Sequence, residues 1–336
     1  MRILIIGVDE PGHVARFLYE GGKRSGHDVA IINTTRANNG NFLARKMLWK
    51  FTHRPISIKS FSSEVASEAE SFNPDLIVTT GQAPILDRDL RLLRDMSLVL
   101  INYSTDDPWN PAHRADWFLK GISTYHVIFT TRKANISEFK NAGCSHVRWL
   151  PFGYDPSSHY YENNSSEEWE SDLAFVGGAD HDRVPVIAEL IKDGLGMSLW
   201  GGYWGRYKET RSVSRGFADT ATLRKVISNT RCALTLVRRA NRDGHAMRTY
   251  EVAAIGAPML VEDTAEHREI FCTDQNLVRY FSTEREMLEG ARWFIENTNL
   301  GNEMSVAVRN HILTGGNTYA DRLQTMIDAV KVLHEN

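Results

Sequence analysis

Cysteine is scarce in this sequence, which has only Cys144, Cys232 and Cys272 among its 336 residues. The three are odd in number and far apart along the chain. They therefore form neither a disulfide framework nor the spacing of a metal site. A reducing compartment is the simplest interpretation of this pattern.

Long hydrophobic runs are also missing. No apolar stretch approaches the roughly 20 residues that a membrane-spanning helix needs. The apolar run in residues 2–7 is too short for a signal peptide, and Asp9 and Glu10 follow it at once. We expect a cytoplasmic protein.

The chain has no large excess of either charge. Its formal net charge is -3 and its pI is about 6.5, which gives no signature of polyanion binding and excludes nucleic acid as an expected partner. The composition, with 42% hydrophobic and 24% charged residues, is that of an ordinary soluble enzyme. Because 336 residues exceed one typical core of about 100 to 200 residues, we expect two domains.

Short apolar segments alternate with helical stretches along the whole chain. This alternation is typical of parallel sheets covered by helices on both faces. It predicts an α/β protein with two doubly wound, Rossmann-like domains. The expected strands lie near residues 3–7, 29–33, 76–80, 98–103, 126–130, 147–150, 173–176, 197–200, 233–237, 258–261 and 277–280.

A polar, aperiodic stretch divides the two series of strands, as is typical of an interdomain linker. We therefore predict an N-terminal domain over residues 1–157, a linker over 158–170 and a C-terminal domain over 171–316. The final helix, 317–336, is expected to pack back on the N-terminal domain.

Three polar loops directly follow predicted strands, at residues 7–14, 104–109 and 177–183. Ligands of doubly wound sheets bind outside the carboxyl ends of the strands. We therefore expect these loops to open onto one central cleft between the domains.

The segment 243–256 predicts a binding site for a nucleotide sugar. A helix is expected to begin with Arg248 and Glu251 and to end at Gly256. A carboxylate at a helix start can accept both ribose hydroxyls, and a guanidinium can bind diphosphate oxygens with two parallel hydrogen bonds. Asp243, eight residues before Glu251, approximates the pair of acids with seven residues between them that many two-domain glycosyltransferases have.

Several further motifs occur in order between residues 171 and 325: Asp172–Gly177 with Arg183, Leu199–Gly201 with Trp204, Arg248–Pro258, Glu269–Phe271, and Asn317–Tyr319 with Arg322. Through them the second half resembles the CgeB-like glycosyltransferases of the GT-B fold, first described as spore-maturation proteins. The first half is similar more loosely, through Asp107–Pro108 and Leu150–Pro156. The resemblance implies donor binding by the C-terminal domain and acceptor binding by the N-terminal domain, without naming a sugar.

The predicted donor site combines these motifs with the helix start. Backbone NH groups of Gly177 and Gly178 are expected to approach the diphosphate, although the two glycines alone could only permit a tight turn. Arg248 and Glu251 could instead form an exposed ion pair on a helix surface. The full predicted set is Gly177, Gly178, Arg183, Gly201, Trp204, Asp243, Arg248, Tyr250 and Glu251.

His13 is the candidate catalytic base. Its loop is similar to the opening loop of inverting GT-B transferases, in which a histidine deprotonates the acceptor hydroxyl and an acid orients that histidine. Asp106 or Asp107 is the available acid, and neutral imidazole can take a proton near pH 7. The alternatives are a histidine that caps the following helix and a retaining enzyme that needs no base.

Adjacent Asp106 and Asp107 could also be read as a metal-binding pair. A GT-B enzyme can neutralise the diphosphate with helix ends and arginines, so we expect no metal, and the two carboxylates before Pro108 could shape the turn instead. No cofactor is expected apart from the nucleoside diphosphate sugar, which is a co-substrate.

Residues 41–54 predict an amphipathic helix with cations around an apolar face. It could contact anionic lipid at the inner membrane face, or receive an acceptor that is lipid-linked or a protein. We favour the simpler interpretation, a helix that faces the core and keeps its lysines in water.

Together these features predict a metal-independent glycosyltransferase that moves a sugar from a nucleoside diphosphate donor to a hydroxyl acceptor. The acceptor is a saccharide, a protein or a lipid-linked molecule. One alternative is a nucleotide-sugar epimerase or hydrolase of the same fold. The other is a non-catalytic binding or structural protein derived from a transferase.

Overall fold

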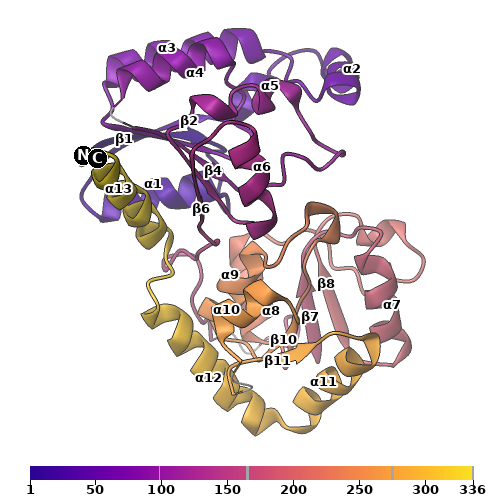
Figure 1. Ribbon diagram of the computed structural model, residues 1–336. Coiled ribbons are helices and arrows are strands. Elements are labelled where there is room, and N and C mark those ends of the chain that lie inside the picture. Colours follow the sequence, from indigo (N-terminus) through magenta and orange to yellow (C-terminus); the bar gives the residue numbers. More distant parts are fainter. Residues whose placement is uncertain (98, 164–165, 274–275, 335–336) are drawn as a thin grey trace. The chain divides into compact units, whose positions relative to one another are not determined.

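The computed structural model describes residues 1–97, 99–163, 166–273 and 276–334. The chain forms two compact units. Unit 1 contains Met1–Phe152, Ala240–Arg242 and the chain from Tyr319 onward, and unit 2 contains Gly153–Arg239 and Asp243–Thr318. Each unit is a parallel sheet with helices packed around it (Figure 1). The predicted fold class, α/β with two doubly wound sheets, is confirmed.

The sheet of unit 1 has six parallel strands in the order β2-β1-β3-β4-β5-β6. Its strands are β1 (Arg2–Gly7), β2 (Asp28–Asn33), β3 (Leu76–Thr80), β4 (Val99–Ser104), β5 (Val127–Thr130) and β6 (His146–Trp149). Its longer helices are α1 (Val14–Arg24), α2 (Phe42–Thr52), α3 (Ile58–Phe72), α4 (Asp87–Met96), α6 (Ile136–Asn141) and α13 (Tyr319–His334), with the one-turn α5 (Asp116–Leu119).

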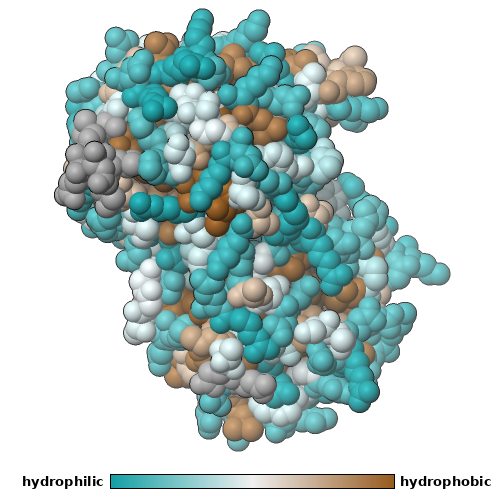
Figure 2. Space-filling model, viewed as in Figure 1, coloured by the Kyte–Doolittle hydropathy of each residue, from teal (hydrophilic) through white to brown (hydrophobic). Residues whose placement is uncertain are grey.

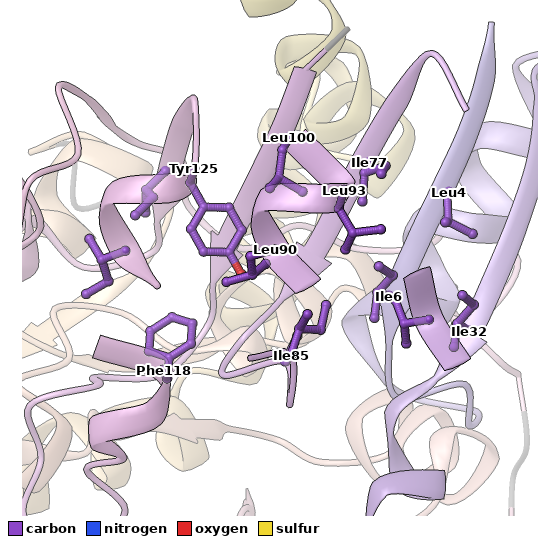
Figure 3. Packing of buried hydrophobic residues seen from close by; sticks show 14 of the residues in the cluster. Leu4, Ile6, Ile32, Ile77, Ile85, Leu90, Leu93, Leu100, Phe118 and Tyr125 are labelled. Atoms are coloured by element: carbon purple, nitrogen blue, oxygen red, sulfur yellow. The ribbon is translucent and has the colours of Figure 1, made fainter. Parts of the chain in front are cut away.

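The core of unit 1 lies between this sheet and its helices. Strands β1 and β4 are buried along almost their whole length, which explains the apolar runs Ile3–Ile6 and Val99–Ile101 in the sequence. Figure 3 shows Leu4 and Ile6 of β1 pointing to the same side of the sheet as Ile77 and Leu100, towards Leu93 of α4. This packing holds the loops after the strands in place.

The C-terminal helix α13 packs against α1 within unit 1. The rings of Phe17 and Tyr319 stack with centroids 5.2 Å apart. Gly21 lets the helices approach closely, because a Cβ at this position would lie 2.9 Å from the backbone nitrogen of Ala320. Unit 1 is thus built from the two ends of the chain.

The sheet of unit 2 has five parallel strands in the order β11-β10-β9-β7-β8. Its strands are β7 (Leu173–Val176), β8 (Met197–Trp200), β9 (Ala233–Thr235), β10 (Met259–Glu262) and β11 (Arg279–Phe281). Its helices are α7 (Arg183–Lys192), α8 (Thr220–Ser228), α9 (Met247–Ile255), α10 (Ala265–Phe271), α11 (Glu284–Glu296) and α12 (Thr298–Thr314).

The eleven predicted strands all occur, with ends that differ from the predictions by at most two residues. Leu98, where the fourth was expected to begin, lies outside the described residues, as do 164–165 of the expected linker and 335–336 of the final segment. The described part of 158–170 is grouped with unit 2.

The expectation that the helix in 41–54 faces the core is wrong. α2, every residue of which the structure describes, buries none of its side chains. Figure 1 shows it projecting from unit 1 beyond the ends of the neighbouring helices.

Candidate functional site in unit 2

The point at which the strand order of unit 2 reverses lies between β7 and β9, which are neighbours in the sheet. From β7 the chain moves to one edge through β8 and then to the other edge through β9, β10 and β11. A crevice forms at such a reversal, outside the carboxyl ends of the two central strands. Gly177 directly follows β7, and Leu236 directly follows β9, so both residues lie at this crevice.

Arg183, the first residue of α7, joins the ends of these two strands. Its guanidinium donates to the Gly178 carbonyl at 3.3 Å and to the Leu236 carbonyl at 3.2 Å, and it lies 3.6 Å from the Asp180 carboxylate. The residue is only 7% exposed. Burial lowers the pKa of this guanidinium, with Asp180 and Asp243 opposing the change and Arg238 adding to it. An arginine nevertheless remains charged in a protein.

The Nε of Arg183 is buried and has no hydrogen-bond partner within the described parts of the chain, and the same is true of the Nε of Arg248. Buried donors of this kind are uncommon in native proteins, and each one calls for an explanation. An anionic ligand at the sheet edge would supply the missing acceptor.

The predicted glycines meet in one tight contact. A Cβ on Gly201, whose φ is 135°, would lie 2.2 Å from the Gly177 carbonyl oxygen. Trp204 is fully buried and its Nε1 donates to that same carbonyl at 2.7 Å. Gly201 and Trp204 therefore shape the loop after β7. Gly178 has more space, since its nearest neighbour would be the Gly202 carbonyl at 3.8 Å.

Glu251 lies in the middle of α9, so the expectation that it stands at the start of the helix is wrong. The alternative of an exposed ion pair is also wrong, because the carboxylate is buried. Its exposed fraction is 1%. It forms an ion pair with Arg248 and lies 3.3 Å from Nε2 of His159. Burial opposes ionisation, but Arg248 and then His159 outweigh it and lower the pKa of Glu251 from 4.5 to about 2. The carboxylate is therefore ionised at neutral pH.

His159 is a member of this cluster that sequence reasoning missed. Its Nδ1 accepts a hydrogen bond from the backbone NH of Asp155 at 3.0 Å. The ring proton consequently lies on Nε2, which faces Oε1 of Glu251. His159 lies in a polar stretch without periodicity, so only its position four residues after Asp155 hints at a local turn.

Two more histidines fix the first half of α9. His245 donates from Nδ1 to the Glu266 carboxylate at 2.5 Å, and its ring meets that of Tyr250 edge to face. His267 donates from Nδ1 to the Glu262 carbonyl at 2.7 Å, so its Nε2 accepts from the Thr249 hydroxyl at 3.0 Å. Burial lowers the pKa of His267 to about 4, so the ring is neutral at pH 7. The neutral ring connects the Glu262 carbonyl to the Thr249 hydroxyl through its two nitrogens.

The other predicted donor residues stand around the same edge. The backbone NH of Asp243 donates to the Arg238 carbonyl at 3.3 Å, which places this acid before α9. A pocket beside Arg183 is lined by Leu236, Glu262, Phe281 and Met287 together with other residues of α7 and α11. Arginine, carboxylate and apolar groups there are the kinds of side chain that bind a polar organic ligand.

In unit 1 the predicted catalytic residues lie in two separate loops. His13 precedes α1 and is half exposed, with its Nε2 3.9 Å from the Glu10 carboxylate. Asp106 is exposed beside Gly81, the residue after β3. No hydrogen bond or ion pair joins His13 to Asp106 or Asp107 among the residues that the structure describes.

Asp107 is fully occupied within unit 1. Arg242 binds it with two hydrogen bonds of 2.7 and 2.9 Å, Asn135 donates to it at 2.9 Å, and so does the backbone NH of Trp109 at 3.0 Å. Burial raises the pKa of Asp107, but these donors, Arg242 first, bring it below the usual value. Its bond to Trp109 shapes the turn at Pro108, and Asp106 remains as the accessible acid.

Within the described ranges, no three His, Cys, Asp or Glu side chains come together as a potential metal site. No helix among those residues is long and apolar enough to cross a bilayer.

Comparison with known proteins agrees with this architecture. Residues 183–328 match a family model described as glycosyl transferase-like. None of the curated proteins is significantly similar to the sequence. The solved sucrose-phosphate synthase of Thermosynechococcus elongatus is 11% identical over all of both chains, with a TM-score of 0.72.

Two further structures are similar over nearly their whole length. The α,α-trehalose 6-phosphate synthase of Burkholderia multivorans is 10% identical over 99% of this chain and 97% of its own, with a TM-score of 0.62. A protein described as a UDP-N-acetylglucosamine 2-epimerase from Listeria monocytogenes is 10% identical over 99% and 96%, with a TM-score of 0.60. The segment 183–328 is thus glycosyl transferase-like, and the whole chain has the GT-B fold with its two Rossmann-like domains.

Proposed function

We propose that this protein is a glycosyltransferase, related to the CgeB-like group, that moves a sugar from a nucleoside diphosphate sugar to a hydroxyl acceptor. The observation that carries the proposal is the pair of buried Nε donors on Arg183 and Arg248, in the glycosyl transferase-like segment, which find no hydrogen-bond partner among the described residues. A diphosphate offers several anionic oxygens, which planar guanidinium groups bind well.

The proposed donor site assigns a role to each group. Arg183 and Arg248 bind the diphosphate, with backbone NH groups of Gly177 and Gly178 beside them. Glu251 holds Arg248 in place and offers its remaining acceptor capacity to the ribose hydroxyls. Asp243 and Tyr250 complete the donor side, and Gly201 and Trp204 support the loop after β7. With arginines to neutralise the phosphates, the transfer needs neither a metal nor a further cofactor.

The transfer itself exchanges one bond for another at the anomeric carbon. A bond forms from the acceptor oxygen to that carbon, the bond to the diphosphate oxygen breaks, and the nucleoside diphosphate leaves. We propose that His13 takes the proton of the acceptor hydroxyl, oriented by the accessible Asp106. If His13 has no such role, the enzyme is of the retaining type and the donor's own phosphate takes the proton.

The proposed partners are the nucleotide sugar and an acceptor that is a saccharide, a protein or a lipid-linked molecule, without nucleic acid. The proposed location is the cytoplasm. Contact with a membrane through 41–54 rests on a different set of residues and is a separate proposal.

Calorimetric titration with UDP, GDP, ADP and their sugars tests the donor site. Wild-type protein is expected to bind one nucleoside diphosphate. At a hundredfold excess of this ligand over Kd, the free energy of unfolding should rise by about 2.7 kcal/mol, and the melting temperature should rise with it. Arg248→Gln removes a charged donor and should weaken binding about 10- to 100-fold.

Arg231→Gln is the matched control. Arg231 also pairs with an acid, Asp172 at 3.1 Å, but it precedes β9 and so lies at the opposite edge of the same sheet. Its replacement should leave the affinity unchanged. Equal losses in both variants, or no binding of any nucleoside diphosphate by the wild type, would contradict the proposed donor site.

An epimerase or hydrolase is the second candidate, favoured by the similarity to the protein described as a UDP-N-acetylglucosamine 2-epimerase. Such an enzyme would convert the bound nucleotide sugar without an acceptor. Incubation of the donor alone, followed by chromatography for an epimer or a free sugar, separates it from a transferase. Binding without any turnover would indicate the third candidate, a non-catalytic protein derived from a transferase.

A further inference from the structure

Helix α2 exposes its apolar side chains to solvent. Leu43, Met47 and Phe51 follow one another at intervals of four residues and therefore lie along one stripe of the helix. They are 69%, 64% and 74% exposed. Figure 2 shows hydrophobic residues gathered on the surface at the place of α2. An apolar stripe of this length on a protein surface indicates an interaction site.

The charges around the stripe all have one sign. No aspartate or glutamate occurs between Asp28 and Glu64. The same stretch contains six cations, namely Arg36, Arg45, Lys46, Lys50, Arg54 and Lys59. Lys46 and Lys50 lie one turn apart and flank the apolar stripe on one side. Arg36, outside the helix, pairs with Glu64 and Glu68. The cations within α2, by contrast, form no ion pair with any residue that the structure describes. The helix therefore combines an apolar face with positive charge that no described carboxylate compensates.

Both ends of α2 are held, although its body packs against little. The Asn41 side chain caps the helix by accepting from the backbone NH groups of Leu43 and Ala44. At the other end His53 adopts a left-handed conformation with a φ of 47°. Its Nδ1 bonds to the Arg114 carbonyl at 2.7 Å, and its own carbonyl accepts from the Trp117 indole at 3.0 Å. An isolated helix of 11 residues has only marginal stability in water. Because α2 buries none of its side chains, these contacts at its two ends stabilise the helix.

We propose that α2 docks the protein on an anionic bilayer surface, with its apolar stripe among the acyl chains near the headgroups and its cations on lipid phosphates. The positive charge of α2 favours an anionic bilayer over a second copy of the protein as the binding partner. Two copies of α2 facing each other would bring like charges together, whereas an anionic bilayer offers both apolar chains and negative charge. The contact is independent of the proposed donor site, which lies in unit 2.

Sedimentation with vesicles tests the charge contribution. The full chain is expected to bind vesicles of equal parts phosphatidylcholine and phosphatidylglycerol far better than vesicles of phosphatidylcholine alone, and salt should weaken the binding. Lys46→Gln with Lys50→Gln removes two charges and should weaken partitioning about 30-fold. The control Lys140→Gln with Lys208→Gln removes two exposed charges elsewhere and should have no comparable effect.

The apolar contribution needs its own pair of variants. Leu43→Ser with Phe51→Ser should weaken partitioning about 10-fold or more, because these side chains would no longer leave water. Leu300→Ser with Val306→Ser changes two exposed apolar residues of α12 and serves as the control. None of the four variants should alter the circular dichroism spectrum or the calorimetric affinity for a nucleoside diphosphate.

Three results would overturn the proposal. The first is equal binding to neutral and anionic vesicles, and the second is equal loss in the α2 variants and their controls. The third is a stable dimer in light scattering that the α2 variants dissociate, with no vesicle binding by the wild type. If the wild-type protein binds no nucleoside diphosphate, only the proposed donor site is refuted. The proposal for α2 is unaffected by that result.

Discussion

The ion pair of Glu251 allows the sharpest quantitative prediction. Glu251→Gln keeps the size of the side chain and an acceptor for Nε2 of His159, but it removes the charge that faces Arg248. The lowered pKa of Glu251, from 4.5 to about 2, corresponds to about 3 kcal/mol of stability at neutral pH. Because 33% of the Arg248 side chain reaches solvent and can be hydrated there, we expect a loss of about 2 kcal/mol.

The pH dependence of this loss has a definite sign. The folded-state pKa of Glu251 is depressed, so its contribution is fully present above the unfolded value of 4.5 and disappears as the pH falls toward 2. The unfolded state binds more protons in this window, and wild-type stability therefore rises with pH. Wild-type protein and Glu251→Gln should differ most at pH 7, and their difference should shrink by about a quarter at pH 4.

Scanning calorimetry is the suitable assay, because a chain with two units need not unfold in one step. A loss of about 2 kcal/mol in a unit of this size should lower its Tm by about 4 to 8 °C. Glu289→Gln is the control, since Glu289 pairs with Arg285 on the exposed surface of α11, where such pairs contribute about 0.3 to 0.5 kcal/mol. A Glu251→Gln protein that melts together with this control at every pH would refute the assignment of a buried, ionised Glu251.

Three other outcomes are expected. Sugar transfer should continue in EDTA, and activity lost to the chelator and restored by Mg²⁺ or Mn²⁺ would contradict the proposed metal-independent mechanism. His13→Ala should reduce kcat about a hundredfold to ten-thousandfold with little change in donor affinity, the usual share of a general base, and near-normal turnover in steady-state assays would remove His13 from the mechanism. Gly201→Ala should lower the Tm through a cost of about 1 to 3 kcal/mol, because its φ of 135° and the Gly177 carbonyl exclude a Cβ. Gly202→Ala serves as the unstrained control, since a Cβ there would have no atom of the described residues within 4 Å.

The fold was predictable because buried parallel strands leave a clear trace in the sequence. Residues 76–80 and 173–176 were predicted to the residue, since both strands consist of apolar and β-branched residues between polar turns. The helix that ends at Gly256 was also predictable, as its φ of 96° needs a glycine there. Such local rules depend on neighbours in the chain, which the sequence displays directly.

The contacts of the site were less predictable because they join distant residues. The spacing of Arg248 and Glu251 indicates an ion pair, but not its burial, which depends on His159 approaching from 92 positions earlier in the chain. The amphipathic pattern of 41–54 is ambiguous for the same reason. A helix whose apolar stripe faces the core and a helix whose apolar stripe faces solvent have the same sequence pattern. Only tertiary packing decides between them.

The construction of unit 1 from both ends of the chain has a consequence for biosynthesis. A ribosome releases the first 152 residues and all of unit 2 before α13 emerges. Until then the face of α1 that carries Phe17 and Gly21 lacks its partner, and a nascent chain exposes this apolar surface while unit 2 can already fold. Premature termination before Tyr319 is therefore expected to leave a product that contains all of unit 2 but exposes the apolar face of α1, and that product should be prone to aggregation.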